Sequence, residues 1–431
     1  MATSDAGIRL RVSRLAREEG GRVIALLAAR FGDLDLADES VQDALVRAIE
    51  TWEDDGAPDN PAAWLYRVAH NIAVDRLRRA ASAARRLERA APDLLREPDV
   101  PEEVPIVEQT PVGDEQLRLM LLCCHPALDR DTQIALTLRL VGGLTTDEIA
   151  AAFLVPEATL AQRIVRAKRK IRDARIPLTI PADLGERVGV LLAVLYLIFN
   201  EGYLARGSAG SAGDAVRLDL ADEAIRLTAT AADLLGGDPE AGGLLALELY
   251  HRARMDTRLD ASGELVLLEQ QDRTRWDLAT VARADRALEQ ALEGAEPPGP
   301  YRLQALIAAA HAHARTADET DWPQIVRLYE LLLRRSPTPV VALNRAVAIA
   351  MADGPRAGLA ALDEVQGLDA YHLRHATEGE LLLRAGEPAA ALAALERALP
   401  LTVNAAERRH LERRIAEARA RAGTAQPGTA H

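Results

Sequence analysis

Apolar residues recur at intervals of three and four through most of the chain, and runs of β-branched residues are few. This spacing places the apolar side chains on one face of a helix, so it predicts an all-α protein. The longest apolar run, Val188 to Phe199, is shorter than the roughly 20 residues that span a bilayer, and it predicts a buried core helix. The pattern divides the chain into five segments: residues 8–80, 81–113, 114–175, 182–295 and 300–420.

The second segment, residues 81–113, differs from its neighbours in composition. Five prolines lie between positions 92 and 111, and eight acids face one base between positions 93 and 115. Prolines interrupt helices and like charges repel, so we expect an acidic, extended linker between two compact domains.

The third segment has the pattern of a helix-turn-helix. Thr145 or Thr146 can cap a first helix, with Glu148 closing a capping box. Pro156 suits the opening of the second helix. In that helix an apolar stripe is predicted to be buried. The stripe consists of Leu160, Ile164, Ala167 and Ile171.

The opposite face of this second helix is basic. Residues 157–175 hold seven bases and two acids, including the only two lysines of the chain, Lys168 and Lys170. The pattern favours a helix that enters a DNA major groove, although a solvated amphipathic helix is the alternative. We expect Thr159, Gln162 and Arg163 to reach base edges, and Arg166, Arg169 and Lys170 to contact phosphates.

The first segment contains two further helical stretches. Residues 33–48 form an acidic amphipathic stretch, a polar turn covers residues 53–61, and residues 62–79 end in a cluster of arginines. In this order and with this gap, the two stretches resemble regions 2.2 and 2.3–2.4 of the extracytoplasmic-function sigma factors of the sigma-70 family (group IV). Residues 114–175 resemble region 4 of the same family.

The resemblance covers about residues 1–80 and 114–175, and it implies three roles. The acidic helix would dock on core RNA polymerase through Asp38, Glu39, Gln42 and Asp43. The next helix would open and read the −10 promoter element, and the helix from Glu157 would read the −35 element. The side chains for the −10 element would be Tyr66, Arg67, His70, Asn71, Arg76, Arg78 and Arg79, of types that suit unstacked bases and phosphates. Alternatively, Trp64 and Tyr66 are core residues and Asp75 pairs with an arginine.

Residues 182–420 extend beyond a minimal sigma factor. Three apolar pairs recur with a period of about 34 residues, which is typical of stacked helix pairs and resembles tetratricopeptide repeats, with chance periodicity as the alternative. The pairs are Ile325/Leu328, Leu359/Leu362 and Leu392/Leu395. The extension resembles that of a sigma-factor subgroup in which it is thought to modulate activity, and it suits a protein or small-ligand partner. A candidate site there comprises Asn200, Glu201, Asp272, Arg273 and Arg275, with buried hydrogen-bonded networks as the alternative.

Composition limits the remaining possibilities. The net charge of −13 argues against non-specific coating of nucleic acid, so any DNA-binding surface is local. The adjacent pair Cys123-Cys124, followed by His125, is predicted to be the buried start of a helix, with a metal site as the alternative. No signal peptide is predicted, and we expect a cytoplasmic protein without a cofactor. The rivals are a helix-turn-helix regulator without a polymerase role and an enzyme, which no phosphate loop, metal spacing or nucleophile motif supports.

Overall fold

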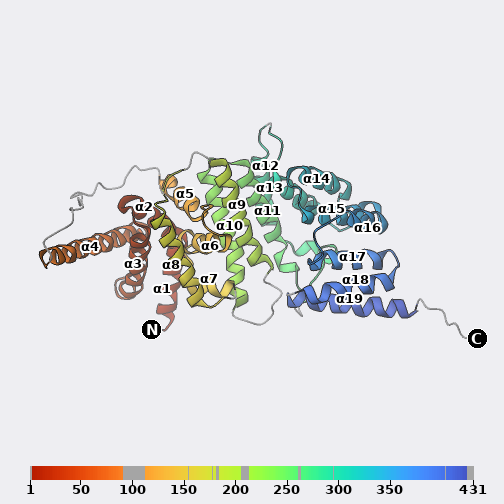
Figure 1. The fold of residues 1–431 in the computed structure, drawn as a ribbon, viewed down its shortest axis with the longest axis horizontal. Coiled ribbons are helices and arrows are strands. Elements are labelled where there is room, and N and C mark those ends of the chain that lie inside the picture. The colour runs from red at the N-terminus through yellow and green to blue at the C-terminus, as the bar shows by residue number, and fades with distance from the viewer. Residues whose placement is uncertain are drawn as a thin grey trace, which may run out of the picture. The chain divides into compact units, whose positions relative to one another are not determined.

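The computed structural model describes residues 2–90, 112–153, 155–176, 178–180, 184–204, 213–260, 264–294, 296–402 and 404–424. Within these ranges the protein is built from helices and contains no strand, only one isolated bridge between Leu259 and Leu265. The predicted all-α fold is therefore confirmed. The chain forms two compact units, residues 1–195 and 196–431 (Figure 1).

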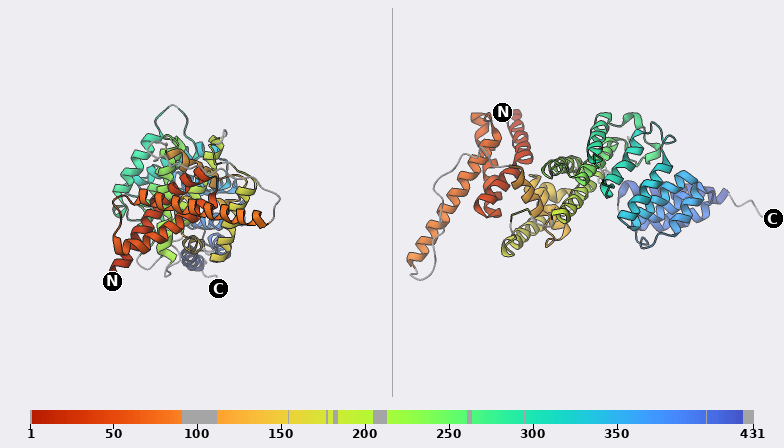
Figure 2. Two further views of the ribbon diagram at one scale, coloured as in Figure 1. Left: turned by 90° about the vertical axis from the view of Figure 1, so that its left-hand side faces the viewer. Right: turned by 90° about the horizontal axis from the view of Figure 1, so that it is seen from above.

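The first half of the first unit holds four helices and one π-helical turn. They are α1 (Ala2–Leu15), η1 (Ala16–Gly20), α2 (Gly21–Phe31), α3 (Leu34–Asp55) and α4 (Pro61–Ala90). Asp33 caps α3 by accepting hydrogen bonds from the amides of Asp35 and Leu36. Helix α4 continues past position 80 to Ala90, and its C-terminal part projects away from α1–α3 (Figure 2).

The second half of this unit contains the predicted helix-turn-helix. Its elements are α5 (Val112–Cys123), α6 (Arg130–Leu136), the π-helical turn η2 (Thr137–Val141), α7 (Thr146–Ala152) and α8 (Glu157–Asp173). Helix α9 (Leu184–Leu204) leads into the second unit. Most of the apolar run within α9 is buried as predicted, with Leu191 and Phe199 both fully inaccessible to solvent, whereas Leu197 is exposed.

The two halves of the first unit pack directly on each other, and glycines make this close approach possible. A Cβ atom at Gly21 in α2 would lie 2.6 Å from the carbonyl oxygen of Val141 in η2. A Cβ atom at Gly143 would overlap the carbonyl oxygen of Ala16, and the φ of Gly143 is +70°. The backbones of the two halves therefore touch where no larger residue fits.

In the first part of the second unit, three helices pack around a fourth, α11 (Pro239–Ala253). The first elements of this unit are α10 (Gly213–Leu234), α11 (Pro239–Ala253), η4 (Met255–Thr257), η5 (Leu268–Gln270), η6 (Arg273–Arg275), α12 (Leu278–Ala291) and α13 (Pro300–His313). Helix α13 lies against α11, where a Cβ atom at Gly243 would lie 2.7 Å from the amide nitrogen of Arg302. The predicted boundary near residues 296–300 thus lies inside one compact unit.

Helices then follow one another to the C-terminal part of the chain (Figure 1). They are α14 (Trp322–Arg335), α15 (Pro339–Asp353), α16 (Pro355–Asp363), α17 (His372–Arg384), α18 (Pro388–Ala398), η7 (Leu399–Leu401) and α19 (Ala405–Thr424). The three repeated apolar pairs fall in α14, α16 and α18, so the sequence period marks every second helix. The tetratricopeptide interpretation stays a prediction.

The structure describes the predicted cysteine pair but little of the predicted linker. Most of the linker, residues 91–111, lies outside the described residues. Cys123 and Cys124 are buried as expected, but Cys123 ends α5 rather than starting a helix, because the apolar run before it is what forms the helix. Burial raises the pKa of the Cys124 thiol to about 12, so this thiol stays protonated.

Candidate functional site

The predicted helix-turn-helix has the local geometry that its sequence indicates. The Thr145 hydroxyl accepts a hydrogen bond from the Glu148 amide at 3.3 Å, and the Glu148 carboxylate accepts one from the Thr145 amide at 2.8 Å. This reciprocal pair is the predicted capping box, with Thr145 as the cap. Pro156 precedes α8 as its N-cap, and all four residues of the predicted apolar stripe are buried.

The opposite face of α8 carries the predicted DNA-binding side chains. Thr159, Gln162, Arg166, Arg169 and Lys170 are exposed, whereas Arg163 is half-buried. Arg163 pairs with Asp131 of α6 at 3.2 Å, Arg169 with Asp173 at 3.2 Å, and Lys170 donates to the carbonyl oxygen of Ala127 at 2.5 Å. Surface contacts of this kind contribute little to stability.

The predicted polymerase-binding residues on α3 do not share one environment. Glu39 and Asp43 are exposed, Gln42 is half-buried, and Asp38 is buried with 5% of its surface exposed. Glu39 and Asp43 both pair with Arg76 of α4, the latter at 2.8 Å. One predicted promoter-binding arginine is therefore held by two predicted polymerase-binding acids.

The side chains predicted to read the −10 element on α4 also divide into exposed and packed groups. Arg67, Asn71, Arg78 and Arg79 are exposed, whereas Tyr66 and Arg76 are half-buried. His70 is buried, with its ring centroid 5.6 Å from that of Phe31 and 6.0 Å from that of Tyr66. Burial, with a smaller effect of Arg30, lowers the pKa of His70, so its ring is neutral at neutral pH.

Two alternative interpretations of this helix agree with the structure. Trp64 packs edge-on against Trp52 with ring centroids 5.2 Å apart, as a core residue would. Asp75 pairs with Arg79 at 3.0 Å. Among the side chains predicted to read the −10 element, the exposed arginines and Asn71 thus remain the most accessible.

A buried ion pair joins the two halves of the first unit. Lys168 of α8 places its Nζ 2.5 Å from Asp38 Oδ2 and 3.6 Å from Asp35 Oδ1, and Arg139 Nη2 lies 3.6 Å from Asp38 Oδ1. The Lys168 and Asp38 side chains are 9% and 7% exposed. Arg172 also pairs with Asp35, at 2.7 Å. Since charges are buried only when they are paired, this contact links α3 and α8 specifically.

Sequence reasoning did not identify this cluster, although one signal was available. Lys168 directly follows Ala167 and so lies beside the apolar stripe of α8, where a lysine is rarely found without a buried partner. The partner itself was not predictable, because Asp38 lies 130 positions away in the chain. Only the packing of the two halves brings them together.

The five predicted extension residues lie on two elements. Asn200 and Glu201 are half-buried in α9, whereas the other three lie on the turn η6 or next to it. Asp272 and Arg275 are exposed, and Asp272 caps η6 by accepting from the Thr274 amide at 3.0 Å. Arg273 is buried and lies over the ring of Trp276, 5.3 Å from its centroid.

Metal-binding and membrane-spanning features are missing from the described residues. Across the part of the chain that the structure describes, no group of three or more His, Cys, Asp or Glu side chains could hold a metal ion. In the same residues no helix is both long and apolar enough to cross a bilayer.

Three protein families match parts of the sequence. The family described as Sigma-70 region 2 matches residues 15–83, and the family described as Sigma-70, region 4 matches residues 118–171. A family of unknown function (DUF6596) matches residues 187–292. The first two matches coincide with the α2–α4 half and the helix-turn-helix half of the first unit.

Curated relatives extend the comparison. An uncharacterised protein of Rhizobium meliloti (strain 1021) is 40% identical over 401 residues, which is 91% of this chain and 92% of that protein. The ECF RNA polymerase sigma factor SigE of Mycolicibacterium smegmatis is 28% identical over 40% of this chain and 64% of its own length. The ECF RNA polymerase sigma-E factor of Escherichia coli K12 is 29% identical over 36% of this chain and 82% of its own length. No solved structure matches.

Proposed function

Because the chain belongs to the extracytoplasmic-function sigma factors of the sigma-70 family and carries a C-terminal extension, we propose that it reads the two elements of a promoter through two different helices. Members of this family are non-catalytic factors for transcription initiation. The α4 helix is proposed to open and read the −10 element, and α8 to read the −35 element. The observation that carries the assignment is the exposed basic face of α8, the second helix of a helix-turn-helix whose first helix begins with a capping box.

Polymerase docking is assigned to Asp38, Glu39, Gln42 and Asp43 of α3. Glu39 and Asp43 face solvent on this helix, and Gln42 lies beside them. Their partner Arg76 is itself a proposed DNA contact. On docking, Glu39 and Asp43 would exchange Arg76 for polymerase, and Arg76 would be released to contact a DNA phosphate. Core RNA polymerase and promoter DNA are the proposed partners, and the cytoplasm, where polymerase acts, is the proposed location.

The buried Lys168–Asp38 pair adds a condition to this proposal. Asp38 contacts α8 and is inaccessible while the two halves of the first unit are packed together. We infer that α3 and α8 separate before Asp38 can contact polymerase. The packed form is then an inactive state, and partners that bind the separated halves shift the population away from it.

Transcription in vitro tests the sigma-factor assignment. Purified full-length protein, core RNA polymerase and genomic promoter fragments are expected to give transcripts with mapped −35 and −10 elements. A protein that binds DNA but not core polymerase would instead be a helix-turn-helix regulator. Folded protein that yields no specific transcript from its own promoters contradicts the proposal.

The extension is proposed to modulate this activity. A truncation that ends at Arg175 removes it, and Gly358→Val disturbs it within the full chain, because a Cβ atom at Gly358 in α16 would overlap Ala350 of α15. The matched control is Gly423→Val in α19, which has open space around its Cα. We expect transcription to fall for the truncation and for Gly358→Val only. Equal transcription from the wild type and all three variants would show that the extension has another role.

A further inference from the structure

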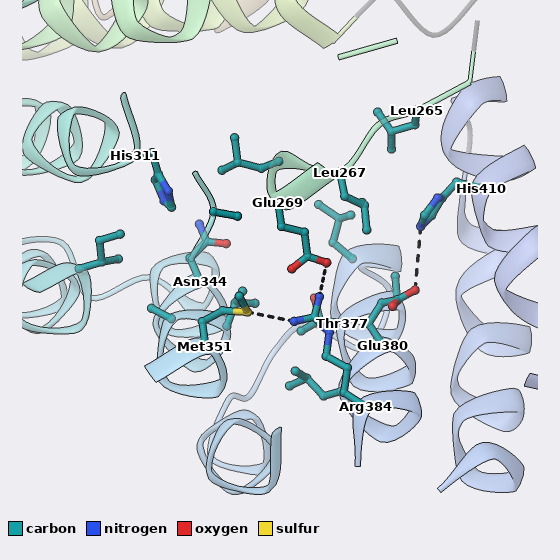
Figure 3. A pocket seen from close by; sticks show the side chains of 18 of the residues that line it. Leu265, Leu267, Glu269, His311, Asn344, Met351, Thr377, Glu380, Arg384 and His410 are labelled. Atoms are coloured by element: carbon teal, nitrogen blue, oxygen red, sulfur yellow. Dashed lines mark hydrogen bonds and ion pairs between the residues drawn. The ribbon is translucent and has the colours of Figure 1, made fainter. Parts of the chain in front are cut away.

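The second unit contains a cavity that lies outside the residues matched by the two Sigma-70 families. Its volume is about 380 Å³, and its walls come from the segment Leu265–Glu269, from η6 and α13, and from α14, α15, α17 and α19 (Figure 3). Most of the wall is apolar, including Leu265, Leu267, Ile325, Val347 and Met351. The size and the lining are those of sites that bind small molecules.

The carboxylates that line this cavity already have partners. Glu269 pairs with Arg384 at 2.5 Å, which joins the segment before η6 to α17 (Figure 3). Glu380 accepts from Arg414 at 2.5 and 2.6 Å, and Glu407 lies 3.0 Å from Nε2 of His372. None of these acids is left to receive a cationic ligand.

Arg273 differs from the other charged side chains of the lining. Its guanidinium donates to the carbonyl oxygens of His311 at 2.9 Å and Ala314 at 2.7 Å and to the Thr320 hydroxyl at 3.1 Å, and all three acceptors are neutral. Its Nε has no partner, and no carboxylate of the described residues lies within ion-pair distance, 4.0 Å. The side chain is 9% exposed, and burial lowers its pKa. Glu319 attracts this buried positive charge only from beyond ion-pair distance, so the charge is incompletely compensated, which favours an anion beside it.

The groups next to Arg273 fit the same kind of ligand. His311 lines the cavity with its Nδ1 unpartnered, and burial, together with Arg254 and Arg273, lowers its pKa to about 4. The ring is neutral at neutral pH, and the positive charges of both arginines act on it. Asn344 of α15 lies on the same side of the cavity as His311 (Figure 3). Its amide makes no hydrogen bond to any described residue, so it is free to donate to a ligand.

We propose that this cavity binds a small apolar molecule carrying a single carboxylate. The apolar body occupies the space between Leu267, Ile325 and Val347, and the carboxylate lies toward Arg273 and Asn344, where it neutralises the buried charge. The proposal goes beyond the sigma-factor assignment, and its binding test contains neither polymerase nor DNA. A failure of one therefore leaves the other standing.

Calorimetry with three ligands of equal chain length tests the proposal on the full-length protein. Octanoate, 1-octanol and octylamine differ in charge at pH 7 but share the apolar body. We expect octanoate to bind and octylamine not to bind. We expect 1-octanol to bind at least about tenfold more weakly than octanoate, since only the carboxylate can form a charge-paired contact with an arginine. Equal affinity for octanoate and 1-octanol, or no octanoate binding at millimolar concentration, overturns the proposal.

Variants locate the ligand. Arg273→Met is expected to weaken octanoate binding about tenfold or more while leaving 1-octanol unchanged. Arg275→Met is its matched control, because Arg275 is exposed on the same turn. Since Arg273 also holds two carbonyl groups, Val347→Phe provides a second variant that fills the cavity from α15 without touching them. Unchanged octanoate binding by folded Val347→Phe protein would place the ligand elsewhere and refute the assignment.

Discussion

Replacing Lys168 by methionine tests whether the packed form of the first unit is inactive. Methionine keeps most of the apolar stem of lysine and removes the charge that faces Asp38 at 2.5 Å. Removing one partner of a buried pair costs about 3–5 kcal/mol. Arg139 remains 3.6 Å from Asp38 and Arg172 remains 2.7 Å from Asp35, so we expect the lower end of this range, about 3 kcal/mol.

This loss belongs to the packed form only, because Lys168 and Asp38 are both solvated once α3 and α8 separate. At about 1.4 kcal/mol for each factor of ten, about 3 kcal/mol changes the ratio of packed to separated molecules about a hundredfold. Where the packed form dominates, the apparent Kd for core polymerase falls by up to the same factor. Fluorescence anisotropy of labelled full-length protein with core polymerase, without DNA, measures it.

Lys170→Met is the matched control for this experiment. Lys170 lies in the same helix but is exposed, and it bonds to Ala127 within its own half of the unit. Circular dichroism first establishes that both variants keep the helical content of the wild type. If Lys168→Met binds core polymerase no more tightly than Lys170→Met, the packed form does not restrict docking and the reasoning is wrong.

Three more experiments test the geometry. Gly143→Ala and Gly32→Ala both place alanine at positive φ, which costs about 1–2 kcal/mol. Of these two glycines only Gly143 contacts the other half of the unit, so thermal unfolding should show the larger loss of stability for Gly143→Ala. Arg163→Ala should cost about 1–3 kcal/mol and relax base preference across a panel of −35 variants, whereas Arg169→Ala should weaken all variants alike and flatten the salt dependence. Burial raises the pKa of Glu248 above its usual 4.5. The stability that the protonated Glu248 side chain contributes to the folded state is therefore lost as pH rises above 4.5. Denaturant titrations should show Glu248→Gln becoming more stable relative to the wild type as pH rises.

The sequence was sufficient for features that depend on neighbouring residues. The capping box of Thr145 and Glu148, the buried stripe of α8 and the buried apolar run of α9 depend on spacings of three and four residues. Helical periodicity fixes which of these side chains face the core, whatever the helix packs against. The same local rules misplaced Cys123, because they do not determine at which residue a helix ends.

The tertiary structure decided which charges are paired and which are not. Asp38 lies on an acidic helix that looks exposed in sequence, and it is buried only because α8 packs over it with Lys168. Arg273 lies in a polar stretch together with Arg275, yet one is buried without a carboxylate partner and the other is exposed. The cost of burying a charge depends on its partners. The partner of Asp38 lies 130 positions away in the chain, and those of Arg273 lie up to 47 positions away. Only the folded chain brings these groups into contact.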